Sequence, residues 1–349
     1  MGPFLCGQRG STVPLFTIQC QNEINMYPLK FENIFKSVVW GGEKIAPFKG
    51  VETDQHNIGE SWELSGVKGN ESVVANGPLA GKTIAELTAE YKGQLLGEKV
   101  YAKTGEEFPL LIKFIDARDD LSIQVHPDDE LAAVRHDGSK GKTEMWYVVQ
   151  ADEKAHLMSG LTKEITPEEY AAKVEDNTIT EVLHDYDVHA GDVFFLPAGR
   201  IHSIGTGCFI AEIQQTSNIT YRIYDFGRVG LDGQPRELHT ELSKAAIDYT
   251  VLPDYKTAYE QKPNQENQIV DCEYFTTSLY EIDLPVTKEM AGLDSFMIVI
   301  CVEGQGTLTD DSGNTVTVRQ GETVLLPATT KTFTLNPEGG MKALTSYIR

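Results

Sequence analysis

An element of twelve residues that occurs twice constrains the fold of this 349-residue chain more than any other feature of its sequence. Residues 191–202 (GDVFFLPAGRIH) recur as residues 321–332 (GETVLLPATTKT). In both copies the glycine and the proline are six residues apart and enclose an apolar run, a pattern typical of a turn, a short strand and a second turn. The repeat therefore predicts two related β units, each built around its own core.

The two copies differ at their last residue, which is His202 in the first and Thr332 in the second. Only the first copy offers an imidazole that can ligate a metal ion. Its spacing, G-x5-P-x-G-x2-H, resembles the second motif of the cupin superfamily, although Thr206 stands where that motif usually has asparagine. The resemblance implies a mainly β fold of two cupin-type jelly-roll barrels, of which only the first binds metal.

The rest of the chain favours short strands with a small helical insertion. Residues 110–115, 145–149 and 208–214 are strand-like runs bounded by turn-forming residues. Helical patterns are present at residues 83–91 and from residue 166 (TPEE), where a threonine precedes a proline and two acids. The sequence thus predicts an N-terminal extension outside the fold (1–25), a metal-binding cupin domain (26–255) with a small helical insert near 166–175, a linker (256–266) and a degenerate C-terminal cupin barrel (267–349).

The charge balance narrows the range of partners. With 30 Lys and Arg against 52 Asp and Glu, the formal charge is −22, which argues against binding to nucleic acid or to anionic membranes. No run approaches the about 18 apolar residues of a membrane span. The five cysteines show no CxxC spacing, so we expect no disulfide framework and a cytoplasmic protein. An anionic substrate would require a local cluster of cations.

Four residues form a candidate metal site. Gln124 and His126 are two residues apart in a strand-like run, so their side chains share one face. Glu144 opens another strand-like run, and His202 follows a Pro-x-Gly turn. Each of these residues alone is more often packed in a core or exposed than a ligand. Together they form a mixed nitrogen and oxygen set that suits zinc, iron(II) or manganese.

Six short motifs surround these residues: 39–42 (VWGG), 59–63 (GESWE), 123–127 (IQVHP), 141–144 (GKTE), 196–202 (LPAGRIH) and 220–225 (TYRIYD). Together they resemble type I mannose-6-phosphate isomerases of the short bacterial form, which lack the large helical insertion of longer members. The resemblance extends from about Met26 to the C-terminus. It implies one zinc ion per chain, held by Gln124, His126, Glu144 and His202, and interconversion of mannose 6-phosphate and fructose 6-phosphate through an enediol.

Aldose–ketose isomerisation also needs a proton-transfer group and an anchor for the phosphate. Lys113, Lys142 and Arg222 lie beside the metal motifs, and family members carry corresponding lysines and an arginine in the substrate pocket. Glu212 matches a glutamate of that pocket. We expect Arg222 to stabilise the enediolate or the phosphate, Lys142 and Glu212 to share acid–base work, and Lys113 to bind substrate.

Two tryptophans are further candidates for the site, and one residue typical of longer family members is missing. Trp40 and Trp62 are candidates to stack on a sugar ring, and core packing explains them equally well. Longer family members have His-Lys-Pro-Glu where this chain has residues 141–144 (GKTE). A proton-transfer role assigned to that histidine cannot pass to Gly141, which has no side chain.

Two other functions fit the same ligands. His126, Glu144 and His202 also match the two-histidine, one-carboxylate set of iron(II) oxygenases, and a non-catalytic cupin that binds sugar phosphates is the other alternative. The neighbouring lysines and arginine favour the isomerase, because an oxygenase has no general need for a cationic rim. The sequence is compatible with a monomer or a homodimer.

Overall fold

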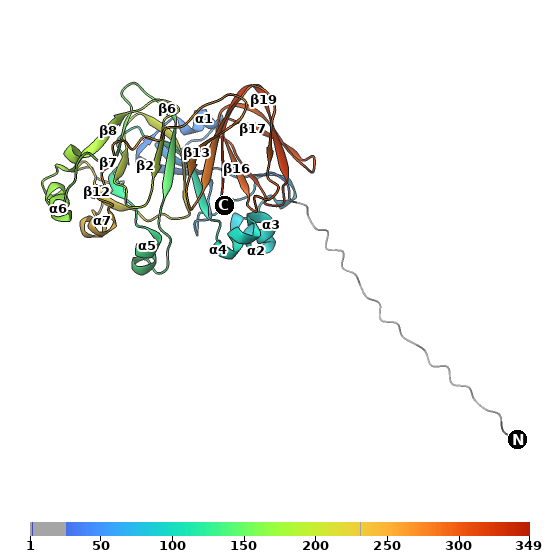
Figure 1. Ribbon diagram of the computed structural model, residues 1–349, viewed down its shortest axis with the longest axis horizontal. Coiled ribbons are helices and arrows are strands. Elements are labelled where there is room, and N and C mark those ends of the chain that lie inside the picture. Colours follow the sequence, from blue (N-terminus) through green and yellow to red (C-terminus); the bar gives the residue numbers. More distant parts are fainter. Residues whose placement is uncertain (1, 3–25, 231) are drawn as a thin grey trace.

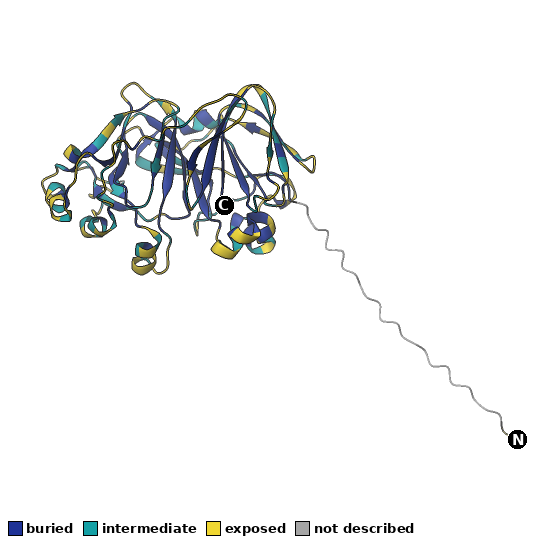
Figure 2. Ribbon diagram, viewed as in Figure 1, coloured by how far each residue is buried: buried dark blue, intermediate teal, exposed yellow. Residues whose placement is uncertain are grey.

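Strands dominate the computed structural model, which describes residues 2, 26–230 and 232–349. The predicted N-terminal extension, residues 1–25, lies outside the described residues except for Gly2. The mainly β class expected from the sequence is confirmed. Figure 2 shows that most strands are buried, whereas the helices present exposed outer faces.

Two sheets form the first part of the molecule. The six-stranded sheet has the order β2 (Ile34–Gly42), β3 (Ile58–Leu64), β4 (Leu110–Asp116), β11 (Cys208–Gln215), β6 (Glu144–Ala151) and β9 (Val193–Leu196). The five-stranded sheet has the order β12 (Tyr221–Tyr224), β5 (Ile123–Val125), β10 (His202–Ile204), β7 (His156–Leu161) and β8 (Leu183–Asp187). Buried side chains from both sheets, including Trp146, Leu157 and Ile204, belong to one apolar cluster. The sheets therefore pack face to face, as in a β-sandwich or a jelly roll.

The C-terminal part forms one larger sheet. Its main path is β1 (Leu29–Lys30), β18 (Thr323–Leu326), β16 (Met297–Asp310), β19 (Thr332–Tyr347), β14 (Thr276–Ile282) and β13 (Glu266–Asp271), with β15 (Val286–Glu289) on β19 and β17 (Thr315–Arg319) on β16. Strand β1 is near the start of the segment that the sequence assigned to the first domain, yet it pairs with β18. In Figure 1, β16, β17 and β19 lie at one end of the molecule and β7, β8 and β12 at the other.

The helices are short and connect the strands. They are α1 (Ile45–Lys49), α2 (Ile84–Tyr91), α3 (Gly93–Leu96), α4 (Glu98–Thr104), α5 (Asp129–Arg135), α6 (Pro167–Glu175) and α7 (Thr240–Ala246), with single turns η1 (Gly77–Leu79) and η2 (Ile179–Val182). Both helices expected from the sequence are present. Thr83 and Thr166 each close a capping box, on α2 and α6. No helix in the described ranges is long and apolar enough to cross a bilayer.

The sequence repeat is also a structural repeat. Gly191 and Gly321 both have positive φ, at 95° and 80°, which explains the glycine in each copy. Each donates its backbone N–H to an earlier strand, Gly191 to Val148 on β6 and Gly321 to Cys301 on β16. The apolar runs that follow form β9 and β18, and the last residue of each copy opens the next strand, β10 or β19. The two copies therefore adopt the same turn-strand-turn-strand path.

The repeat also shows how the C-terminal sheet differs from a metal site. In the first copy, Leu196 is the cross-strand partner of Glu144. In the second copy the equivalent leucine, Leu326, is the partner of Met297. Met297 is fully buried in an apolar cluster. The C-terminal sheet therefore has a methionine in place of the carboxylate and Thr332 in place of the histidine, and neither side chain is a typical ligand for zinc.

An ion-paired histidine ties the end of β7 to two neighbouring segments. His156 Nδ1 lies 2.8 Å from Asp185 Oδ1, and His156 Nε2 lies 3.1 Å from Asp120 Oδ1. The bond to Asp120, together with the bond to Asp185, outweighs partial burial and raises the pKa of His156 to about 9. The imidazolium therefore remains charged at neutral pH and links β7, β8 and the segment before β5.

We expect His156→Gln to lower the Tm by about 1–2 °C at pH 6. The pKa of an unfolded histidine is about 6.5, below that of folded His156, so protonation stabilises the fold. This contribution is full below about pH 6.5 and is lost as the pH rises through about 9. The difference in Tm between wild type and variant, measured by circular dichroism, should therefore close by about pH 10. An equal difference at both pH values would contradict this, and His189→Gln, at an exposed histidine, is the control.

Candidate functional site

Two buried histidines from neighbouring segments of the five-stranded sheet form the centre of the site. His126 directly follows β5, and His202 opens β10. The Nδ1 atom of His126 lies 2.9 Å from the carbonyl oxygen of Ile219, and that of His202 lies 2.8 Å from the carbonyl oxygen of Arg200. A carbonyl oxygen can only accept, so each ring donates from Nδ1. Both Nε2 atoms are therefore unprotonated and can each offer a lone pair to a metal ion.

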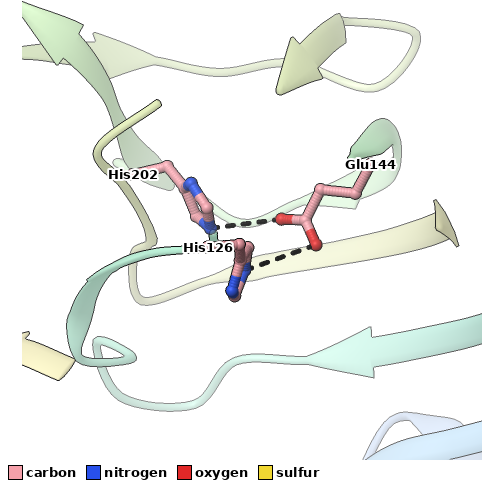
Figure 3. A group of neighbouring side chains, drawn as sticks. All are labelled: His126, Glu144 and His202. Atoms are coloured by element: carbon pink, nitrogen blue, oxygen red, sulfur yellow. Dashed lines mark ion pairs between the residues drawn. The ribbon is translucent and has the colours of Figure 1, made fainter. Parts of the chain in front are cut away.

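Glu144 faces the two histidines from the opposite sheet. Figure 3 shows its carboxylate facing both rings, with Oε1 3.1 Å from His202 Nε2 and Oε2 3.6 Å from His126 Nε2. Glu144 is fully buried, and among the described residues its Oε1 and the Nε2 of His202 have no hydrogen-bond partner. Three ligand atoms that can only accept thus lie within 4.8 Å of one another. A divalent cation would satisfy all of them, so the donor set fits a metal ion.

Lys142 supplies positive charge to this cluster. Its Nζ lies 3.0 Å from His126 Nε2 and donates to Glu144 Oε2. Burial alone would raise the pKa of Glu144, but the Lys142 ammonium and the two histidines hold it well below its usual range. Burial and the same ammonium hold the pKa of His126 well below its usual range. The cluster therefore keeps a charged carboxylate and a neutral imidazole, the forms that bind metal.

A row of side chains crosses the five-stranded sheet. Arg222 on β12 is the cross-strand partner of Gln124 on β5, and Gln124 is the partner of His202 on β10. Directly opposed residues point to the same face of a sheet, at Cβ separations of about 4.5–5.5 Å. Register therefore places the amide of Gln124 beside His202 and the guanidinium of Arg222 beyond it.

A second row crosses the six-stranded sheet and faces the first. Lys113 on β4 is flanked by Trp62 on β3 and by Glu212 on β11, and Glu212 is in turn opposite Trp146 on β6. Lys113 Nζ lies 3.1 Å from Glu212 Oε1, and Trp146 Nε1 donates to Glu212 Oε2 at 2.8 Å. Burial lowers the pKa of Lys113, but the carboxylates of Glu212 and Glu60 outweigh it and raise that pKa above its usual range. Lys113 is therefore a permanent cation.

A cavity lies between the two rows, beside the metal cluster. Its walls are formed by Val38, Trp40, Glu60, Lys113, Ile115, Leu121, Ser122, Gln124, Lys142, Ile204, Glu212, Thr220, Arg222 and Arg236. Four of these residues are cations and two are carboxylates, although the whole chain carries a formal charge of −22. The cavity is thus a local cationic site that suits an anionic ligand rich in hydroxyl groups.

The residues predicted from the sequence are distributed as follows. Six of them line the cavity: Trp40, Lys113, Gln124, Lys142, Glu212 and Arg222. Glu144 accepts a hydrogen bond from one of these, Lys142. His126 and His202 complete the buried cluster. Trp62 is not among the lining residues; it lies behind Lys113, with the ammonium 5.4 Å from its ring, and donates from Nε1 to Glu60. Trp62 therefore packs against Lys113, and Trp40 is the one of the two tryptophans that lines the cavity.

Three residues of the site were not singled out from the sequence. Trp146 packs edge-on against His202, with ring centroids 5.2 Å apart, and bonds to Glu212. Its position two residues after Glu144 on the same strand was a usable signal. Glu60 and Arg236 also line the cavity. Arg236 lies after β12 and outside the six motifs, and no pattern in the sequence marks it.

Position 141 has no room for a side chain. A Cβ atom added to Gly141 would lie 2.5 Å from the carbonyl carbon of Asp128 and 2.6 Å from the backbone nitrogen of Asp129. The histidine that longer relatives have at this position would therefore require a different backbone path. Proton transfer in this chain has to use other residues.

Comparisons with known proteins agree with this geometry. The family model described as "Phosphomannose isomerase type I, catalytic domain" matches residues 28–144, and "Mannose-6-phosphate isomerase, cupin domain" matches residues 265–348. The chain is similar to mannose-6-phosphate isomerase ManA of Bacillus subtilis, with 33% identity over 92% of this chain and 99% of the relative. It is equally similar to mannose-6-phosphate isomerase of Streptococcus mutans, with 33% identity over 92% of this chain and 98% of that protein.

A solved structure also supports the similarity to mannose-6-phosphate isomerases. The crystal structure of mannose 6-phosphate isomerase from Bacillus subtilis superposes with a TM-score of 0.83 at 30% identity, covering 93% of this chain and 100% of that one. Phosphomannose isomerase from Salmonella typhimurium, at 17% identity and a TM-score of 0.75, shows the shared fold alone. The cupin assignment made from the repeat is confirmed.

We expect His202→Ala to lower the affinity for Zn²⁺ by about 100-fold or more, because it removes a ligand and leaves the Glu144 carboxylate facing a gap. Zinc retained after dialysis against a weak chelator, measured by inductively coupled plasma mass spectrometry, checks this. His56→Ala, at an exposed histidine, is the control and should retain as much zinc as the wild type. Equal zinc in all three proteins would rule out the cluster as the metal site.

Proposed function

We propose that this chain, which belongs to the family of type I mannose-6-phosphate isomerases, interconverts mannose 6-phosphate and fructose 6-phosphate in the cationic cavity beside the metal cluster. One juxtaposition carries the proposal: the His126–Glu144–His202 cluster adjoins a cavity with four cations in its walls. A two-histidine, one-carboxylate cluster alone would suit an iron(II) oxygenase equally well. The cations favour a sugar phosphate, because phosphate is bound most strongly through charge-assisted hydrogen bonds.

The metal that we propose is zinc, with Gln124, His126, Glu144 and His202 as its protein ligands. When bound, it would act as a Lewis acid that polarises and aligns the substrate oxygens at C1 and C2. The chain itself prepares the ligands. Carbonyl groups hold both imidazoles in the right tautomer, and Lys142 keeps the carboxylate of Glu144 ionised.

The phosphate is anchored by Arg236. Arg236 lines the cavity and is held by Asp225, with Nε–Oδ2 2.7 Å and Nη2–Oδ1 2.5 Å. A guanidinium fixed by a carboxylate loses little further freedom when it binds a second anion. Arg222 is the cross-strand partner of Gln124, a proposed metal ligand, so we assign it to the reacting oxygens rather than to the phosphate.

Isomerisation moves the C2 proton of the aldose to C1, while the C1 carbonyl oxygen gains a proton and the C2 hydroxyl loses one. The enediol between these states carries partial negative charge on its oxygens, which Arg222 stabilises. Its Nε makes no hydrogen bond to the described residues, so donor capacity remains. Lys142, just before β6, and Glu212, on the neighbouring strand β11, exchange the protons. Lys113 stays protonated and orients Glu212 through their ion pair.

A coupled assay for fructose 6-phosphate formed from mannose 6-phosphate tests the proposal. Wild type should turn over the substrate, lose activity after chelation and regain it with Zn²⁺, because the bound metal would supply the Lewis acid. His202→Ala should remain inactive with added zinc. Oxygen consumption after loading with Fe²⁺ is measured in parallel. No turnover at full zinc occupancy would overturn the isomerase proposal, and oxygen uptake would favour the oxygenase.

A matched pair of arginine variants tests the phosphate anchor. Arg228 and Arg236 both bind Asp225, but only Arg236 lines the cavity among the described residues. We expect Arg236→Gln to raise the KM for mannose 6-phosphate by about tenfold or more, because a charge-assisted bond to phosphate contributes about 1.5–3 kcal/mol. Arg228→Gln should leave KM within about twofold. Steady-state kinetics measures KM for both variants. Equal increases in KM would mean that the loss of a bond to Asp225, and not the loss of a phosphate anchor, causes the effect.

A further inference from the structure

A hairpin of the C-terminal sheet contacts the first part of the molecule at the start of α5, the helix that follows His126. Strands β13 and β14 are joined by a tight turn in which Cys272 N–H donates to the Phe275 carbonyl. Tyr274 lies in this turn and is half-buried. Its hydroxyl donates to Asp129 Oδ2 at 2.9 Å, in the first turn of α5. A single hydroxyl thus connects the C-terminal sheet to the helix that follows His126.

Asp129 also forms hydrogen bonds that fix the segment leading to Glu144. Its other oxygen, Oδ1, accepts the backbone N–H of Gly141 at 2.7 Å and the side-chain amide of Gln215 at 3.1 Å. The carbonyl oxygen of the Gln215 side chain accepts the backbone N–H of Thr143 at 2.8 Å. Two backbone donors just before Glu144 are therefore held by side chains that depend on Asp129.

The segment held in this way is the one that sets the position of Glu144. Residues 141–143 lead directly into β6, which begins at Glu144, and they include Lys142, whose ammonium contacts His126 and Glu144. Packing also limits movement, because Gly141 already lies against the backbone of residues 127–129. A shift of this segment would move the carboxylate relative to the two imidazoles.

We propose that Tyr274 is a positioning residue, through which the C-terminal sheet holds the Gly141–Glu144 segment in the geometry that binds metal. This inference rests on the metal site put forward under the proposed function. It gives the histidine-free C-terminal part a direct role in the site, although none of its side chains lines the cationic cavity within the described residues.

The chemistry of the contact suits a fixed support. Partial burial and the bond to Asp129 raise the pKa of Tyr274 above its usual range, so its hydroxyl remains a donor throughout the working pH range. The ammonium of Lys103 lies 5.8 Å from the centroid of the tyrosine ring and 3.4 Å from Glu273 in the same turn. The hairpin therefore meets both α4 and α5, which limits the freedom of its turn.

Tyr274→Phe in the full-length protein tests the inference, because it removes one hydroxyl and keeps the ring. We expect the affinity for Zn²⁺, measured by competition with a fluorescent chelator, to fall by about 3- to 10-fold, somewhat less than for a direct partner of a ligand. The absorption spectrum of the Co²⁺-loaded protein should change as well, because the Glu144 oxygen moves. The kcat for mannose 6-phosphate should fall more than KM changes, since the cationic wall is untouched.

Tyr259→Phe is the matched control. Its hydroxyl also donates to the first part of the molecule, to the carbonyl oxygen of Gly191 at 2.8 Å, but it does not contact residues 141–144. The control should keep wild-type metal affinity and the wild-type Co²⁺ spectrum. Equal metal affinity in both variants and in the wild type would overturn the role of Tyr274. A wild type that binds no zinc would overturn the metal site itself, so the two failures are distinguishable.

A double-mutant cycle with Asp129→Ala separates positioning from general stability. If Tyr274 acts only through Asp129, Tyr274→Phe should cost no further metal affinity in the Asp129→Ala background. Thermal unfolding of all four proteins shows whether each one is folded. Additive losses of affinity would mean that Tyr274 does not act through Asp129 and would overturn the proposed route.

Discussion

The buried carboxylate of Glu144 is the constraint on which the rest of the site depends. A charged group taken out of water is costly unless it is paired, and Glu144 is fully buried. Its nearest groups include two unprotonated imidazole nitrogens, which cannot donate to it. Lys142 supplies one cation, and the remaining unpaired Oε1 leaves a place for another. A buried, incompletely paired carboxylate destabilises an apolar core, but it is well suited to binding a divalent ion.

Two facing sheets make this arrangement possible. Side chains on one face of a sheet recur every second residue and line up across strands, so a few residues on each strand can build a row. One row places Gln124 and Arg222 beside His202, and the opposite row places Lys113 and Glu212 on the far wall. A protein of strongly negative charge thus forms a small cationic cavity without changing the charge of its outer surface.

The C-terminal sheet shows what the same element does without a ligand set. Its copy of the repeat keeps the glycine turn, the short strand and the second turn, but Met297 and Thr332 stand where the first copy has Glu144 and His202. Apolar packing fills the corresponding space, so this sheet needs no ion for stability. It can therefore serve as a support, and the Tyr274 hydroxyl links it to Asp129, which holds the segment before Glu144.

The sequence by itself determined the mainly β class, the repeat, the two capped helices and the three residues of the buried His126–Glu144–His202 cluster, because these follow from local spacing and from motifs a few residues long. Strand pairing needed the tertiary structure: β1 joins the C-terminal sheet, Trp62 lies behind Lys113, and Trp146 and Arg236 belong to the site. The link from Tyr274 to residue 141 spans more than a hundred residues along the chain and leaves no local pattern. Contacts between distant segments depend on register and packing across sheets, which only the folded chain decides.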